Sequence, residues 1–117
     1  EVVNRITGFK HVIPTHQGRA AENVLFSYLV KEGNVIPGNA HFDTTKGHIE
    51  SRKAFAIDVT TDEAKDTQLE VPFKGNVSLE KLEKVLKENN GNVPFMVLTV
   101  TNNTVRLANF VISMAFR

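Results

Sequence analysis

The feature that most constrains this chain is an apolar run that ends at a proline and is followed by a glycine opening a helix. Residues 9–14 form the run, interpreted as a short strand, and Gly18 begins a helix expected over 18–32. Its apolar residues recur at helical spacing and predict the buried face, which comprises Ala21, Val24, Leu25, Tyr28 and Leu29. Because helix N-termini expose unpaired N–H groups, a helix start of this kind can bind a phosphate group.

Further strand-like and helical segments alternate along the rest of the chain. Strands are expected over 35–42, with an interrupting turn at Pro37 and Gly38, over 53–59, and over 93–101. The last run is nearly continuous in apolar and β-branched residues, which is typical of a strand buried on both faces. Residues 62–68 are expected to form one helical turn. Strands separated by helices predict an α/β fold with a largely parallel sheet.

The second long helix has the clearest start and end signals. Ser78 is expected to cap it, and the sequence Asn89-Asn90-Gly91 is expected to end it. Its predicted apolar face comprises Leu79, Leu82, Val85 and Leu86.

Composition excludes several classes of protein. With 117 residues, 41% of them hydrophobic, the chain forms one domain at most. A net charge of +1 argues against a nucleic-acid partner, and no apolar run approaches the roughly 18 residues that a membrane span needs. The sequence has no cysteine, which excludes disulfides and thiolate metal sites and favours a cytoplasmic location.

A second marked cluster, His41-Phe42-Asp43-Thr44-Thr45, follows the first helix. Taken alone, Phe42 is most simply a core residue and Asp43 a solvated turn carboxylate. His41 and His48 flank Asp43, but their spacing matches no common set of metal ligands, so no metal is expected. Together with the helix start at Gly18, however, the cluster provides an aromatic surface and a phosphate seat, as a phosphorylated ring cofactor requires.

Four ordered segments resemble one family, namely residues 13–22, 42–48, 73–76 and 100–103. They are similar to tryptophanase and tyrosine phenol-lyase, which are β-eliminating lyases dependent on pyridoxal 5'-phosphate. The resemblance implies the aspartate aminotransferase-like fold, fold type I, with a mostly parallel sheet and flanking helices. Residues 1–104 would then be part of the large cofactor-binding domain.

The resemblance also implies roles for individual residues. Gln17, Gly18 and Arg19 would bind the cofactor phosphate, largely through backbone N–H groups. Phe42 would stack on the pyridine ring, and Asn103 would lie beside the phenolic oxygen of the cofactor, where a hydrogen bond tunes its electronics.

Asp43 bears on the substrate. Tryptophan-cleaving members resemble this chain in having Phe-Asp at this point, whereas tyrosine-cleaving members have Phe-Thr. Asp43 is therefore the candidate catalytic residue, and the implied reaction converts tryptophan to indole, pyruvate and ammonia. The resemblance also implies a homo-oligomer.

Two departures from the family pattern shape the expected activity. The family's Schiff-base lysine lies well downstream, in a Ser-x-x-Lys-type stretch, and none of the lysines of this chain is assigned to it. Residues 105–117 form an atypical tail, expected to be a strand. The chain is therefore expected to be a fragment or truncated member, inactive alone and prone to self-association through uncovered apolar surface. The alternative is a non-catalytic α/β domain that binds at most a phosphorylated small molecule.

Overall fold

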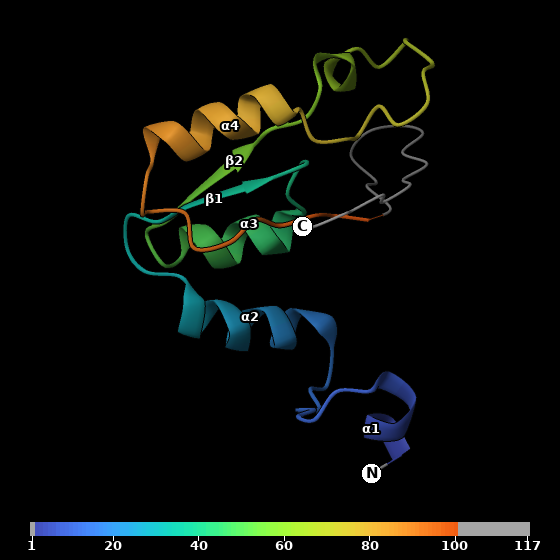
Figure 1. The fold of residues 1–117 in the computed structure, drawn as a ribbon, viewed down its shortest axis with the longest axis vertical. Coiled ribbons are helices and arrows are strands. Elements are labelled where there is room, and N and C mark those ends of the chain that lie inside the picture. Colours follow the sequence, from blue (N-terminus) through green and yellow to red (C-terminus); the bar gives the residue numbers. More distant parts are fainter. Residues whose placement is uncertain (1, 101–117) are drawn as a thin grey trace.

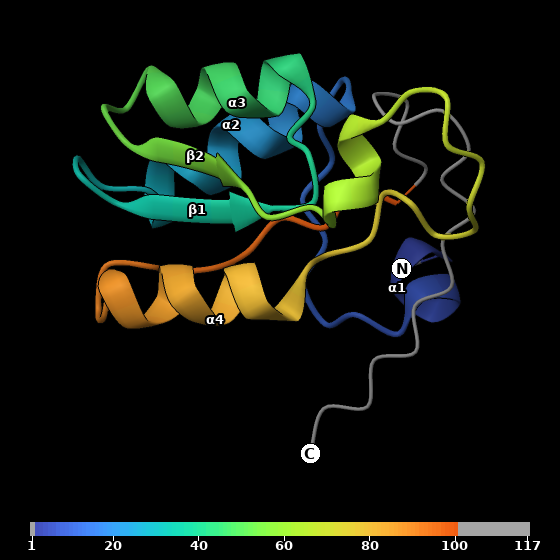
Figure 2. The same ribbon diagram turned by 90° about the horizontal axis from the view of Figure 1, so that it is seen from above.

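The protein folds as three layers, with helices on both faces of a small sheet (Figures 1 and 2). The computed structural model describes residues 2–100. The elements in chain order are α1 (Val2–Thr7), α2 (Gly18–Leu29), β1 (Val35–Gly38), α3 (Asp43–Glu50), β2 (Phe55–Asp58), the 3₁₀ helix η1 (Asp62–Lys65) and α4 (Leu79–Glu88). The predicted α/β class is confirmed. No helix within residues 2–100 is long and apolar enough to cross a membrane.

The sheet consists of β1 and β2, which pair in parallel with Val35 opposite Phe55 and Gly38 opposite Asp58. All of β1 is buried, and its side chains alternate between two cores. Ile36 packs with Phe26 and Ile49 beneath α2 and α3, while Val35 packs with Val85 beneath α4. The predicted parallel arrangement is confirmed for these strands. The predicted turn at Pro37 and Gly38 is wrong, since both residues belong to β1.

Residues 93–100 follow the other edge of β1 without forming the predicted strand. Val35 donates a hydrogen bond to the carbonyl of Asn92, and Val97 donates one to the carbonyl of Pro37. One isolated parallel bridge, between Gly38 and Val97, is formed. On this side of β1 Pro37 has no N–H to donate, so the ladder lacks one hydrogen bond. The strand prediction is wrong for 93–100, and residue 101 lies outside the described part.

Helix α2 forms where predicted, but it packs through a different face. Phe26 and Val30 are buried, whereas Val24, Leu25 and Tyr28 are 56%, 52% and 84% exposed. The helix bears apolar side chains around most of its circumference, so spacing alone does not select the face that meets the sheet. The contacts with β1 and α3 select the Phe26 face.

The N-terminal residues differ most from expectation. Residues 9–14 are exposed and have no regular structure, so the predicted strand is wrong. No strand of the described chain lies beside them to supply pairing. The unpredicted helix α1 precedes them and ends at Gly8, which adopts a φ of 74° and donates to the carbonyl of Asn4.

Helix α4 confirms the predicted capping. Ser78 accepts a hydrogen bond from the backbone N–H of Lys81, and the chain turns at Gly91, whose φ is 78°. Its buried side is narrower than predicted, since Val85 is buried while Leu79 and Leu86 are exposed. The predicted helical turn at 62–68 is the 3₁₀ helix η1.

The Lys81 ammonium also ties α4 to η1, 2.7 Å from Oδ1 of Asp62. Hydrogen bonds from Lys81 and Lys65 lower the pKa of the Asp62 carboxyl below its ordinary value. A carboxyl whose pKa is lower in the folded state stabilises the fold above its unfolded pKa, and this stabilisation disappears as the pH falls through the folded pKa.

We therefore expect Lys81→Met to raise the pKa of Asp62 toward the ordinary value, as followed by NMR of its carboxyl carbon during acid titration. The exposed position of Asp62 predicts a small effect on stability. Lys84→Met, which removes a lysine that pairs with Glu88 instead, serves as the control. An unchanged titration of Asp62 in the Lys81 variant would contradict the assignment.

Candidate functional site

The first turn of α2 is open to a ligand. Gln17 precedes the helix in an extended conformation, with φ −165° and ψ 166°, and its side chain does not cap the helix. Ala20 and Ala21 donate the first hydrogen bonds, both to the carbonyl of Gln17. The N–H groups of Gly18 and Arg19 precede these bonds and therefore have no acceptor within the helix. All three predicted phosphate-binding residues are exposed.

The turn from β1 to α3 presents the predicted ring. Phe42 immediately precedes α3 and is 46% exposed, so it is not the core residue that its apolar character alone suggests. Asp43 is the first residue of α3 and is exposed. A helix was not predicted here, because Thr44, Thr45 and Gly47 have low helix propensity. Burial of Thr45 and Ile49, one turn apart, holds the helix against the core.

The two helix starts lie at the same end of the molecule. Both α2 and α3 begin at the end where β1 and β2 finish, as both views show (Figures 1 and 2). The hydroxyl of Thr45 donates a 2.8 Å hydrogen bond to Glu22, which joins the first turn of α3 to α2. The structure therefore places Gly18 and Phe42 on the same side of the fold. Asn103, the remaining predicted cofactor residue, lies outside the described residues.

Asn39 links residues that lie in or directly beside two of the segments that carry the family resemblance. This completely buried residue follows β1, and its amide donates to the carbonyls of Gly75 and Thr99 at 3.0 and 3.1 Å. Its Oδ1 accepts a 2.7 Å hydrogen bond from the backbone N–H of Thr99. The turn before Phe42 is thus connected to the loop around Gly75 and to the segment around Thr99.

An interaction that the sequence reasoning missed holds the same turn. The Nδ1 atom of His41 lies 2.7 Å from Oδ1 of Asp58, at the end of β2. His41 is one of the two histidines that flank Asp43 in the sequence. Within residues 2–100 no group of three or more acidic, histidine or cysteine side chains could hold a metal. No sequence signal identifies this pair, because the contact depends on the register of β1 against β2.

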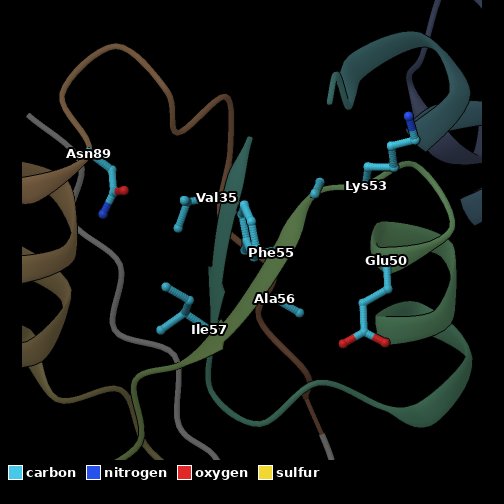
Figure 3. A pocket seen from close by; sticks show the side chains of 8 residues that line it. Val35, Glu50, Lys53, Phe55, Ala56, Ile57 and Asn89 are labelled. Atoms are coloured by element: carbon cyan, nitrogen blue, oxygen red, sulfur yellow. The ribbon is translucent and has the colours of Figure 1, made fainter. Parts of the chain in front are cut away.

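A separate hollow of about 630 Å³ runs along the outer edge of β2. Its lining includes Val35 and Phe55, the first residues of the two strands, and Asn89, just after the end of α4. Figure 3 shows Glu50 and Lys53 on one side of the strands and Asn89 on the other, so their polar groups do not converge. The hollow therefore offers no candidate binding site comparable to the helix starts.

A free helix start and an exposed aromatic ring thus lie at the carboxyl end of parallel strands, the place where open α/β sheets bind ligands. The chain belongs to the beta-eliminating lyase family, whose model matches residues 1–111. That match extends into the tail at 105–117, and the strand expected there stays a prediction.

Named relatives are similar over most of the chain. A probable beta-eliminating lyase of Trichomonas vaginalis is 67% identical over 89% of the chain. A tryptophanase of Hyphomonas neptunium is 50% identical over 86% of it, and a tyrosine phenol-lyase of Pasteurella multocida is 46% identical over 88%. The chain spans only 22–23% of the length of these relatives. Similarity to both named activities leaves the substrate open.

Proposed function

We propose that this chain supplies the phosphate cradle and the ring platform of a pyridoxal 5'-phosphate-dependent carbon–carbon lyase of fold type I. The observation that carries the proposal is the shared position of the two helix starts, one with free N–H groups at Gly18 and the other with the half-exposed ring of Phe42. A helix N-terminus attracts a dianion through its free donors and its dipole.

The residues present fit this cofactor. The backbone N–H groups of Gly18 and Arg19 would hold its phosphate, and a side chain at Gly18 would meet nothing within 4 Å. Phe42 would stack on the pyridine ring and fix its orientation, and Asn103 would bind the phenolic oxygen. When bound, pyridoxal phosphate would supply an electron sink for negative charge at the amino acid's α-carbon.

The proposed substrate is tryptophan, which together with one water molecule would yield indole, pyruvate and ammonia. Asp43 supports this choice, because its carboxylate follows Phe42 directly and would hold a proton beside the departing ring. Replacement by threonine would remove that proton carrier.

Non-covalent binding of a phosphorylated small molecule is the second candidate function. It is supported by the side-chain contacts of seven of the chain's nine lysines. Six of them pair with carboxylates: Lys46, Lys53, Lys65, Lys81, Lys84 and Lys87. Lys74 is buried and donates to the carbonyls of Asp66 and Leu69.

Titration with pyridoxal phosphate, pyridoxal and inorganic phosphate tests the proposal. We expect pyridoxal phosphate to bind more tightly than either of the others, because only it engages both the helix start and the ring. Phe42→Leu should weaken pyridoxal phosphate binding by roughly 2- to 10-fold, the worth of an aromatic stacking pair. Phe55→Leu, which alters an aromatic side chain 60% exposed on β2, is the control.

Borohydride reduction followed by intact mass measurement then separates the two candidate functions. Binding without a covalent adduct would support the second function, and one adduct per chain with indole release would support the lyase. Equal affinity for pyridoxal phosphate and pyridoxal would contradict a phosphate cradle in either case.

We also propose that the chain forms a homo-oligomer in the cytoplasm. Support for association comes from α2, where Val24, Leu25 and Tyr28 are more than half exposed. Light scattering over a concentration series is expected to show a mass that rises above that of one chain. A constant monomer mass at the highest concentration would contradict association.

A further inference from the structure

The carboxylate of Asp58 makes two contacts with His41, the residue that precedes Phe42. Its Oδ1 accepts a 2.9 Å hydrogen bond from the backbone N–H of His41 and lies 2.7 Å from Nδ1 of the same residue. Asp58 ends β2, whereas His41 follows β1. Asp58, at the end of β2, thus holds the turn that follows β1.

The imidazole ring of His41 is buried and closely packed against the backbone of β1. Its side chain is 1% exposed, whereas that of Asp58 is 53% exposed. A Cβ placed on Gly38 would lie only 2.7 Å from Cε1 and 2.8 Å from Nε2 of His41. The ring therefore occupies the space that the missing side chain of Gly38 leaves open.

The turn formed by Asn39, Ala40 and His41 has little conformational freedom. Asn39 is buried and bonded to Gly75 and Thr99, and Ala40 adopts a φ of 73°, in the left-handed region that disfavours a side chain. Such a conformation persists only where neighbouring contacts hold it. The bonds of Asn39 on one side and of His41 on the other provide that hold.

We propose that Asp58 and His41 are positioning residues that aim the ring of Phe42 toward the start of α2. This inference rests on the proposed function, in which Phe42 is the ring platform. Neither residue needs to touch the cofactor. They act through the backbone of the turn, which sets the direction in which the next side chain leaves.

The first test follows the turn without any ligand. The sequence has no tryptophan, so Phe42→Trp introduces a single indole reporter. In that background, Asp58→Ala removes the acceptor oxygen, whereas Asp58→Asn keeps an oxygen that can accept both bonds. We expect acrylamide quenching of the indole to rise about twofold in the alanine variant, since a released turn opens more often, and to stay unchanged in the asparagine variant. Equal quenching in both variants would overturn the proposal.

The second test measures ligand affinity with Phe42 intact. Asp58→Ala should weaken pyridoxal phosphate by roughly 3- to 10-fold, as expected when stacking is lost, and leave inorganic phosphate unchanged. Asp58→Asn should restore wild-type affinity for both ligands. Glu32→Ala removes an exposed carboxylate that pairs with Lys53 and should change neither. An equal loss for both ligands would overturn the positioning role and indicate a general structural one.

Failure of the proposed function can be told apart from failure of this inference. If the wild-type chain binds neither ligand, the cofactor proposal fails while the quenching test still decides how the turn is held. If Asp58→Ala does not fold, as judged by circular dichroism, His41→Phe decides. It keeps a ring against Gly38 but loses the Nδ1 bond, and quenching identical to that of the parent would overturn the proposal.

Discussion

Replacing Gly18 by proline is expected to weaken the binding of inorganic phosphate and of pyridoxal phosphate by roughly 10- to 100-fold, the worth of one hydrogen bond to a charged group. Proline has no N–H, so the substitution deletes one donor from the start of α2. The helix should survive, because proline is well tolerated at the first helical position. Gln17 already has the extended conformation that a following proline requires.

Gly18→Ala provides a matched control for this experiment. Alanine retains the N–H, and its methyl group would meet no atom within 4 Å. Phosphate affinity should therefore stay near that of the wild type, as measured by isothermal titration calorimetry. Equal losses in the proline and alanine variants would show that the backbone donor at Gly18 does not bind the phosphate.

Gly38→Ala is expected to lower the free energy of unfolding by about 1–3 kcal/mol, as overpacking in a core does. The added methyl group would lie 2.7 Å from the ring of His41 and 3.0 Å from the carbonyl oxygen of Val97. Either the ring or the backbone of the flanking segment must move. Because His41 is held by Asp58, the displacement should also reach the turn that bears Phe42.

Gly47→Ala tests the same substitution where there is room for it. Gly47 lies within α3, and a Cβ there would meet nothing within 4 Å. Alanine should stabilise the fold by about 0.5–1 kcal/mol, since glycine costs helix stability through its backbone freedom. Urea unfolding of the two variants measures the contrast. A Gly38 variant as stable as the wild type would show that the turn adapts to the added volume.

Local signals in the sequence predicted the elements whose neighbours leave little choice. Ser78 and Gly91 bounded α4 correctly, because capping depends on residues adjacent in sequence. The apolar run over 53–59 located β2, whereas half of β1 falls on the turn predicted at Pro37 and Gly38. The face of α2 was not predictable, since Phe26 is buried only because α3 and β1 lie beside it.

Some residues of the candidate site could likewise be predicted from the sequence, whereas others could not. Gly18 and Phe42 were found from motif and resemblance, and the structure places both at helix starts. The pairing of His41 with Asp58 depends on the ends of two parallel strands lying side by side, over a separation of 17 residues. Neither residue type at either position indicates such a contact until the register of the sheet is known.

The proline in β1 has a further consequence for how the protein opens. On one side β1 pairs with β2 along four residues, whereas on the other the missing donor of Pro37 leaves the segment around Val97 more loosely tied. Local unfolding begins where backbone hydrogen bonds are fewest. The segment around Val97 should therefore detach from β1 before β2 does, and amide hydrogen exchange would proceed inward from that flank.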